Sequence, residues 1–162
     1  MDIVVLADTH LKNGIDQLHQ KVLTSLRSAD LILHAGDFVS PRVLTELAEF
    51  AEVRGVLGNN DGALIGRLSE TLEFEVDGVG FAMVHDSGRS LARSSRLARQ
   101  FPQSRVVVFG HSHVPVNELG VGGQVLFNPG SPTQRRTQPF CTFGWIRVKG
   151  GDIRTRRIEA LD

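Results

Sequence analysis

The sequence predicts an α/β fold in which a parallel sheet formed by the first third of the chain is followed by antiparallel strands. Two observations predict this. In the first third, three short apolar runs alternate with two segments of helical periodicity, the pattern of a parallel sheet with right-handed crossovers. In the second half, short apolar runs are joined by Gly-rich turns, which is typical of antiparallel neighbours.

Length and composition restrict the class of protein. With 162 residues, 41% of them hydrophobic, the chain suits one compact domain, residues 1–162. Eighteen basic and eighteen acidic residues give a formal net charge of zero, which argues against bulk nucleic-acid binding but not against a local positive site. Cys141 is the only cysteine, so no intrachain disulfide can form and a reducing compartment is expected.

No segment of the chain predicts secretion or membrane insertion. The N-terminus runs directly into the apolar residues 2–7 without a basic leader or a cleavage site. No apolar run approaches the roughly 20 residues that a membrane-spanning helix needs. We therefore expect a cytoplasmic protein with no membrane partner.

The first third of the chain predicts five elements. Residues 2–7 are continuously apolar, as expected of a strand buried on both faces. Apolar residues recur at helical spacing over 14–28, which predicts an amphipathic helix. A short strand at 31–33 precedes a helix over 41–50, opened by a proline. Residues 53–57 are predicted to form the third strand.

The second half predicts a hairpin, a helix and further strands. Asp77-Gly78 is a hairpin signal between strands 72–76 and 79–84. A helix is expected over residues 89–101. Four further strands are predicted, of which the last three are expected to be antiparallel: 106–109, 123–127, 140–148 and 152–158. No repeat, low-complexity stretch or linker interrupts the chain, which supports a single domain.

Polar residues of a particular kind follow five of the predicted strands. Ligands of open parallel sheets bind at the carboxyl ends of the strands. Each of these five strand ends carries Asp, Asn or His, and four of the six histidines are among them. The residues are Asp8 and His10, Asp37, Asn59 and Asp61, His85, and His111 and His113.

This set of side chains predicts a centre of two metal ions. Carboxylate and imidazole ligands without thiolate suit manganese, iron or zinc rather than a structural zinc site. Seven ligands are too many for one ion but fit two ions if one carboxylate is shared, and Asp37, the middle position, is the natural bridge. Gly36, Gly58 and Gly110 let the backbone approach the ions without Cβ clashes.

The order of these motifs resembles that of the calcineurin-like metallophosphoesterases. The motifs are D-x-H at Asp8, G-D at Asp37, G-N-x-D at Asn59, a lone His85, and G-H-x-H at His111. The short chain and the segment Asn128-Pro129-Gly130-Ser131 resemble the small bacterial and archaeal phosphodiesterase branch. The resemblance implies a four-layer αββα sandwich of two mixed β-sheets flanked by helices.

The resemblance also implies a ligand set and an activity. One ion would be held by Asp8, His10, Asp37 and His113, and the other by Asp37, Asn59, His85 and His111. The implied activity is a metal-dependent phosphoesterase, expected to be a phosphodiesterase, that hydrolyses P–O bonds by in-line attack of a metal-bridging hydroxide. Manganese is the expected ion, with zinc, iron or nickel as alternatives. The expected partner is a small phosphate ester, and a homo-oligomer is compatible with the sequence.

Several residues are assigned roles around this centre. Asp37, Asn59, His85 and Asp61 are the expected catalytic residues, Asp61 as a support from behind the ligands. Asn60 stands where many relatives have a histidine and cannot act as a general acid, so we expect phosphomonoesters with poor leaving groups to be slow and diesters or activated aryl esters to be favoured. The expected substrate-binding residues are Asn60, Asn128, Ser131 and Arg135. Asp86 could either orient His85 or cap a turn.

Other features keep alternatives open. His19 is expected to pack on the apolar side of the first helix, and His34 to be structural or next to the site. The arginines at 89, 93, 96 and 99 form either a solvated face or a surface that steers substrates. A nuclease is one alternative function. The other is a non-catalytic scaffold like the retromer subunit of the same fold, whose metal site is degraded.

Overall fold

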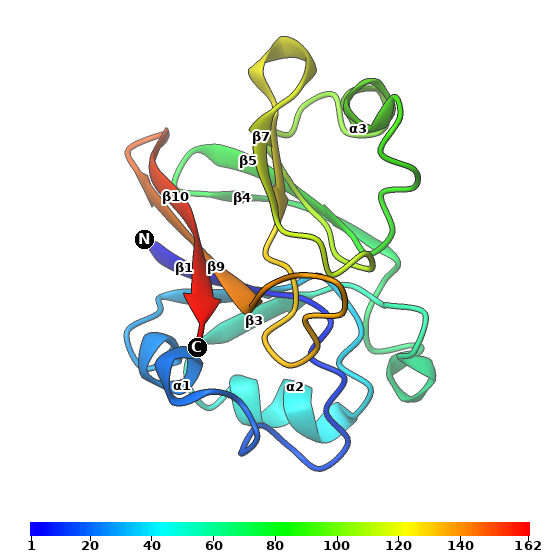
Figure 1. Ribbon diagram of the computed structural model, residues 1–162. Helices are drawn as coiled ribbons and strands as arrows, with labels where there is room; N and C mark the ends of the chain where they lie inside the picture. Colours follow the sequence, from blue (N-terminus) through cyan, green and yellow to red (C-terminus); the bar gives the residue numbers. More distant parts are fainter.

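The computed structural model describes all 162 residues and has four layers (Figure 1). A pair of helices covers one five-stranded sheet, a second five-stranded sheet packs against the other face of the first, and a single helix covers the far side. The four-layer αββα sandwich is therefore confirmed. No helix is long and apolar enough to cross a membrane.

The first sheet contains the N-terminal parallel strands and the C-terminal hairpin. Its strand order is β10-β9-β1-β2-β3, in which β1, β2 and β3 are parallel and β9 and β10 are antiparallel additions. The strands are β1 (Asp2–Leu6), β2 (Leu31–His34), β3 (Glu52–Gly55), β9 (Cys141–Lys149) and β10 (Asp152–Leu161).

The second sheet has a parallel centre and antiparallel edges. Its order is β4-β5-β6-β8-β7, in which β5, β6 and β8 are parallel. The strands are β4 (Thr71–Val76), β5 (Val79–Val84), β6 (Val106–Val108), β7 (Val116–Leu119) and β8 (Val125–Asn128). Each sheet thus contributes three parallel strands whose carboxyl ends can carry a ligand site.

Three α-helices close the two outer faces. They are α1 (Gln20–Leu26), α2 (Pro41–Leu47) and α3 (Arg93–Gln100), and two short 3₁₀ turns are η1 (Gly62–Leu64) and η2 (Val121–Gly123). The start of α2 is encoded locally, because the Ser40 side chain accepts a hydrogen bond from the Arg42 N–H and proline occupies the first turn.

Alternation along the strands sends side chains into different cores. In β1, Ile3 and Val5 belong to the core between the two sheets, whereas Val4 and Leu6 belong to the core beneath α1 and α2. A third, smaller core joins Leu97 of α3 to the second sheet. Both faces of β1 are buried, which explains why this strand is continuously apolar.

All three α-helices are shorter than predicted, and α2 ends at Leu47 rather than at residue 50. Residues 15–18 form a turn in which Leu18 N–H bonds to Ile15 C=O, and α1 begins only at Gln20. His19 is therefore not a packed residue on the apolar side of that helix. It is exposed and caps α1, accepting a hydrogen bond from Lys21 N–H. The helix predicted from residue 89 begins at Arg93, after the left-handed Ala92 (φ 57°).

The expectation that the last three predicted strands are antiparallel is wrong for one of them. β8 runs parallel to β6, because the chain crosses back through β7 and η2 before β8 begins. The strand β7 was not predicted. Most of its residues are exposed, so it lacks the apolar alternation that signals a strand.

Candidate metal centre

The seven predicted metal ligands converge between the two sheets. Asp8 and His10 follow β1, Asp37 follows β2, and Asn59 follows β3 in the first sheet. His85 follows β5, and His111 and His113 follow β6 in the second sheet. Segments that are far apart in the sequence therefore meet at the carboxyl ends of parallel strands, as the sequence predicts.

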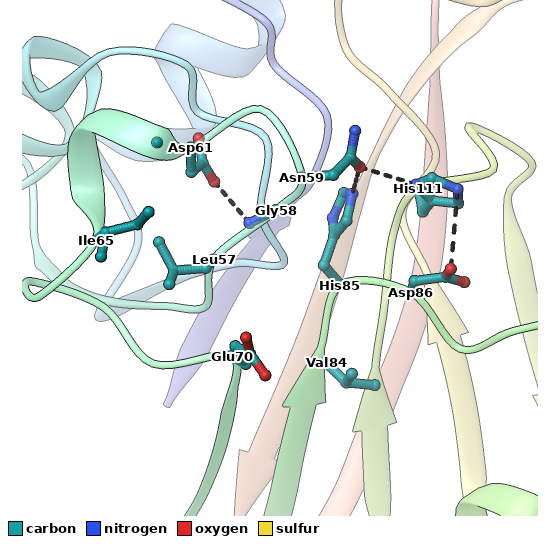
Figure 2. A pocket seen from close by; sticks show the side chains of 11 residues that line it. Leu57, Gly58, Asn59, Asp61, Ile65, Glu70, Val84, His85, Asp86 and His111 are labelled. Carbon is teal, nitrogen blue, oxygen red and sulfur yellow. Dashed lines mark hydrogen bonds and ion pairs between the residues drawn. The ribbon is translucent and has the colours of Figure 1, made fainter.

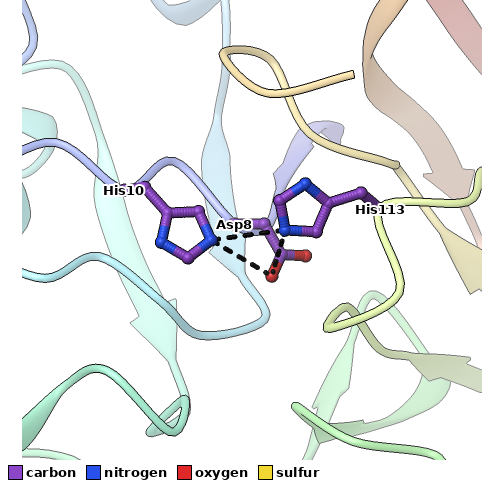
Figure 3. Close-up of side chains that lie close together, drawn as sticks. All are labelled: Asp8, His10 and His113. Carbon is purple, nitrogen blue, oxygen red and sulfur yellow. Dashed lines mark hydrogen bonds and ion pairs between the residues drawn. The ribbon is translucent and has the colours of Figure 1, made fainter. Parts of the chain in front are cut away.

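One half of the cluster consists of Asp8, His10 and His113, whose nitrogen and oxygen atoms face one another (Figure 3). The Nε2 atoms of His10 and His113 lie 3.3 Å apart. The Oδ1 atom of Asp8 lies 3.4 Å from His113 Nε2 and 3.9 Å from His10 Nε2. Three potential ligand atoms thus surround one point.

The other half is arranged around the side-chain oxygen of Asn59 (Figure 2). Asn59 Oδ1 lies 3.1 Å from His85 Nε2 and 3.1 Å from His111 Nδ1. His85 is buried, whereas Asn59 and His111 are exposed, so this half opens to solvent.

Asp37 lies between the two halves. Its Oδ2 atom is 3.6 Å from His10 Nε2 and 3.5 Å from His85 Nε2. Burial raises the pKa of the Asp37 carboxyl, but hydrogen bonds from His85 and from the Asn60 backbone and side chain outweigh it and hold this pKa well below its ordinary value. Asp37 is thus an anion in reach of both halves, which is the position that the predicted bridge requires.

Two of the four histidines, His85 and His113, have their second nitrogen bonded to a backbone carbonyl. His85 Nδ1 lies 2.7 Å from the Ala35 carbonyl, and His113 Nδ1 lies 2.7 Å from the Gln134 carbonyl. Because a carbonyl only accepts, each Nδ1 carries a proton. Protonated His85 donates its Nε2–H to Asp37, whereas in the neutral imidazole each Nε2 presents its lone pair to the cluster. This is the usual arrangement of metal-binding histidines.

A divalent cation fits these residues. Asp8 Oδ1 is fully buried and has no hydrogen-bond partner, although a buried carboxylate oxygen without a partner is costly. The nitrogen at 3.4 Å from it, Nε2 of His113, presents a lone pair rather than a donor when the imidazole is neutral. A cation would satisfy the carboxylate and the lone pairs together, and oxygen with imidazole nitrogen is a suitable donor set for manganese, iron or zinc.

Burial and neighbouring groups shift the pKa values of two histidines of the cluster, His10 and His85. Burial lowers the pKa of His10, while Asp37 and Asp8 oppose the shift. Burial lowers the pKa of His85 as well, but there the hydrogen bonds with Asp37 and with the Ala35 carbonyl outweigh burial and raise this pKa above its ordinary value.

The backbone at the ligands is unusual. Nine non-glycine residues have positive φ, and five of them are candidate ligands: Asp8, His10, Asp37, His111 and His113. Such conformations cost free energy and concentrate at functional sites. The loops therefore hold the candidate ligands in position at a cost in local stability.

Asp61 supports the ligand loops and does not join the cluster. Its Oδ2 accepts hydrogen bonds from Asp37 N–H and Gly58 N–H, both at 2.8 Å, and its Oδ1 accepts from Val39 N–H at 2.7 Å. The carboxylate ties the loop after β2 to the loop after β3, and its side chain is directed to backbone rather than to the other ligands.

All three predicted glycines allow close approach to a ligand, and a Cβ atom at Gly36 would lie 2.6 Å from His85 Nδ1. A Cβ atom at Gly58 would overlap the backbone nitrogen and carboxylate of Asp37. A Cβ atom at Gly110 would lie 2.8 Å from Asp8 Oδ2. Any larger residue at these positions would displace a ligand.

Two of the predicted substrate-binding residues are buried and bond to the backbone. Asn128 donates to the Gly110 carbonyl at 3.0 Å and accepts from Gly130 N–H at 2.9 Å. Ser131 donates to the Asp8 carbonyl at 2.7 Å. Their side chains are almost fully buried, so the structure places them as braces of the ligand loops and gives a substrate no access to them.

The other two predicted substrate-binding residues are exposed, but only one lies at the cluster. Asn60 Nδ2 donates to Asp37 Oδ2 at 2.7 Å. Arg135 donates to the Gln138 carbonyl and lines a separate pocket. Its neighbour Arg136 instead donates to the His111 carbonyl at 3.3 Å, and its charge contributes to lowering the pKa of His10. Arg136 is therefore the arginine beside the cluster.

The arginines of α3 have structural contacts. Arg96 donates to the carbonyls of Ser87, Arg89 and Leu91 and so holds the loop after His85. Arg93 stacks over the Phe109 ring. These two side chains belong to the packing of α3 and its loop rather than to a free basic face.

The structure places Asp86 and His34, the two residues whose roles the sequence left open. Asp86 Oδ1 caps the turn at Gly88 N–H, and its Oδ2 lies 3.9 Å from His111 Nε2, so it faces His111 rather than His85. His34 is fully buried beneath the cluster, stacks on Phe38 and lies 3.0 Å from Thr9 Oγ1. It acts as a structural residue between two ligand loops.

A pocket of about 450 Å³ adjoins the half of the cluster formed by Asn59, His85 and His111 (Figure 2). One wall is the segment 57–70 and the other contains the end of β5 and the loop after β6. Sequence patterns did not indicate this pocket, because its walls come from separate loops. A small ligand that enters it meets three candidate ligands directly.

Most of the chain matches one described family. Residues 1–151 match the calcineurin-like phosphoesterase superfamily domain. A probable metallophosphoesterase from Methanothermobacter thermautotrophicus is 35% identical over 154 residues, which cover 93% of this chain and 87% of that protein.

Solved structures share the fold. An archaeal phosphodiesterase superposes with a TM-score of 0.75 at 24% identity and covers 99% of this chain and 100% of its own. Vps29 from Entamoeba histolytica, complexed with Zn²⁺, has a TM-score of 0.75 at 20% identity and covers 100% of this chain and 99% of its own. At these identities the likeness establishes the fold alone.

Proposed function

Because the chain belongs to the calcineurin-like phosphoesterase superfamily, we propose that it is a metal-dependent phosphodiesterase acting on small phosphate diesters at a two-ion centre. The observation that carries this proposal is the convergence of six candidate ligand side chains, three on either side of the seventh, Asp37. One group contains His10 and the other His85, and both reach Asp37 Oδ2 within 3.6 Å.

The chemistry is divided between the ions and the protein. When bound, two divalent ions supply Lewis-acid polarisation of the phosphoryl oxygens and a water of lowered pKa. The protein's own side chains hold the ligand geometry and bind the substrate. Arg136 is the exposed cation beside His111, so we assign it to a phosphoryl oxygen of the substrate.

Asn60 favours diesters over monoesters in this proposal. Its amide donates to Asp37 Oδ2, so it holds the central carboxylate in place, and it has no titrating proton to give to a leaving group. Poor leaving groups would therefore depart slowly. Aryl diesters carry good leaving groups and need no such proton. The likeness to an archaeal phosphodiesterase supports the same direction.

The ion and the compartment are further parts of the proposal. The donor set of carboxylate, amide oxygen and imidazole supports manganese, with zinc, iron or nickel as alternatives. A single cysteine, Cys141, which lies outside the cluster, supports a reducing compartment such as the cytoplasm.

The experiment is a metal and substrate panel. Purified protein is stripped of metal, reloaded with manganese, zinc, iron or nickel, and assayed on bis(p-nitrophenyl) phosphate, cyclic nucleotides and p-nitrophenyl phosphate. We expect hydrolysis of the aryl diester to exceed that of the monoester. Asp37→Asn is expected to lower kcat/KM by about 100-fold or more, because it weakens both halves of the centre. Exposed Asp16, changed to Asn, is the matched control.

A scaffold remains the second candidate, because proteins named Vps29 share the fold. Metal binding alone does not separate the two functions, since one of those structures contains Zn²⁺. Turnover does. Metal-loaded protein that binds two ions but hydrolyses no ester of the panel would support the scaffold and contradict the phosphodiesterase.

A further inference from the structure

The pocket beside Asn59, His85 and His111 has two kinds of wall. Its apolar side chains are Leu57, Ile65 and Val84, and Ile65 is 74% exposed. Its exposed acidic side chains are Glu70 and Asp86. Figure 2 shows Ile65, Leu57 and Glu70 on one side of the space and Val84, His85 and Asp86 on the other.

No lysine or arginine lines this pocket. A third acidic residue, Asp61, also lines the pocket, but its two carboxylate oxygens accept hydrogen bonds from three backbone N–H groups. Glu70 and Asp86 are therefore the free charges of the pocket. Neither has a lysine or arginine as a salt-bridge partner; Asp86 accepts a hydrogen bond from Gly88 N–H and faces the His111 ring at 3.9 Å.

A positive charge lies beside His111 but outside the pocket. Arg136 donates to the His111 carbonyl, and its charge acts on His10. A phosphate diester at the centre would thus have a guanidinium beside the cluster, and two carboxylates with apolar surface in the pocket. This asymmetry gives the substrate an orientation, because like charges repel and unlike charges attract across a few ångströms.

We propose that this pocket binds one ester group of the substrate and selects cationic or uncharged apolar alcohols over anionic ones. The proposal rests on the proposed phosphodiesterase function and adds the substrate class to it. The volume of about 450 Å³ suits a small alcohol of this kind. Its apolar part contacts Leu57, Ile65 and Val84, and its positive charge lies between Glu70 and Asp86. A second phosphate or sulfonate is repelled.

The test uses three p-nitrophenyl phosphodiesters of similar size. Their second alcohol is choline, its uncharged analogue 3,3-dimethylbutanol, or 2-hydroxyethanesulfonate. With metal-loaded protein at low ionic strength, we expect kcat/KM for the choline ester to exceed that for the sulfonate ester by about tenfold or more, with the uncharged ester between them.

Substitutions in the pocket test whether its two carboxylates cause the preference for the choline ester. Glu70→Gln combined with Asp86→Asn, the double variant, is expected to lower the choline-to-sulfonate ratio by about fivefold. The control, Glu49→Gln combined with Asp16→Asn, removes the same two negative charges at exposed positions outside the pocket and leaves the ratio unchanged. A sulfonate ester that is hydrolysed as fast as the choline ester would overturn the proposal. A choline-to-sulfonate ratio that the double substitution in the pocket leaves unchanged would also overturn it.

A second readout does not depend on catalysis. Metal-free protein is titrated with benzyltrimethylammonium or with benzenesulfonate while the methyl NMR signals of Ile65 and Val84 are recorded. We expect the cation to shift both signals, the sulfonate to shift neither, and the double variant to bind the cation several-fold more weakly. Equal shifts with both ions, or none with the cation, would overturn the pocket proposal. If none of the diesters is hydrolysed but the cation binds as expected, the phosphodiesterase assignment fails and the pocket assignment stands.

Discussion

Asp8 Oδ1 and His113 Nε2 face each other at 3.4 Å, and both side chains are fully buried. The imidazole has its proton on Nδ1, which bonds to the Gln134 carbonyl, so two acceptors meet without a hydrogen between them. The carboxylate oxygen has no other partner. The metal-free site therefore stores unfavourable electrostatics that a cation would relieve.

Asp8→Asn is expected to stabilise the metal-free protein while weakening metal binding. The new amide can donate to His113 Nε2, and its oxygen can still accept from His111 N–H, as Asp8 Oδ2 does. We expect a gain of about 1 kcal/mol in the free energy of unfolding, measured by urea denaturation with a chelator at pH 8. A loss of stability in this variant would contradict the description of Asp8 Oδ1 as a buried acceptor without a partner.

Gly58→Ala is expected to damage the centre, whereas Gly62→Ala in the same loop is not. A Cβ at Gly58 would overlap Asp37, while a Cβ at Gly62 meets nothing within 4 Å. We expect the first change to cost about 1–3 kcal/mol of stability and about 10–100-fold in metal affinity. The second should stay within about 0.5 kcal/mol. Denaturation and calorimetric metal titration measure both. Equal effects of the two substitutions would contradict the proposed packing.

Asp61→Asn is expected to weaken metal binding without removing a ligand. An amide has only one oxygen, so at least one of the N–H groups of Asp37, Val39 and Gly58 would face an NH₂ group. The residue is buried, and we expect a loss of about 2–3 kcal/mol. Urea denaturation and metal titration against the exposed control Asp16→Asn provide the measurement. A metal affinity equal to that of the wild type would show that the two loops hold their geometry without this carboxylate.

His34 is expected to make stability fall as the solution becomes acidic. Burial lowers the pKa of His34 from 6.5 to about 3. Its Nδ1 has no partner, and its Nε2–H donates to Thr9 Oγ1, so a second proton would be buried without an acceptor. Between pH 6.5 and about 3, the unfolded chain binds a proton that the folded chain does not. Stability is therefore complete above pH 6.5 and is lost as the pH falls.

The variant His34→Phe tests this dependence. It keeps an aromatic ring against Phe38 but has no proton to bind. We expect the slope of unfolding free energy against pH, measured between pH 6 and 4 on metal-free protein, to decrease by up to about 1.4 kcal/mol per pH unit. Replacing exposed His19 by Asn is the control. An unchanged slope in His34→Phe would mean that another group is responsible.

The parallel pairing of the first three strands and the convergence of the seven candidate ligands could be predicted because they depend on one regular feature. Residues directly after parallel strands meet at one edge of a sheet, so the position of Asp8 or His85 in the sequence defines its position in space. The support by Asp61 was predictable for the same reason. The parallel pairing of β8 was not, because β7 is short, exposed and without alternation.

Residues in irregular loops were harder to assign. Asn128 and Ser131 have the right polarity for substrate binding, but their partners are backbone groups of distant loops, which no local pattern reveals. Arg135 and Arg136 are adjacent, yet only Arg136 lies by the cluster, where its backbone has a φ of 50°. His19 has helical spacing to its apolar neighbours but precedes the helix as its cap.

The position of the bound ions tests the central claim most directly. Crystals grown with excess manganese would be measured at the manganese absorption edge for anomalous scattering. We expect two peaks about 3.5–4 Å apart, one at Asp8, His10 and His113 and the other at Asn59, His85 and His111, with Asp37 in contact with both. A single peak, or peaks away from Asp37, would contradict the two-ion centre.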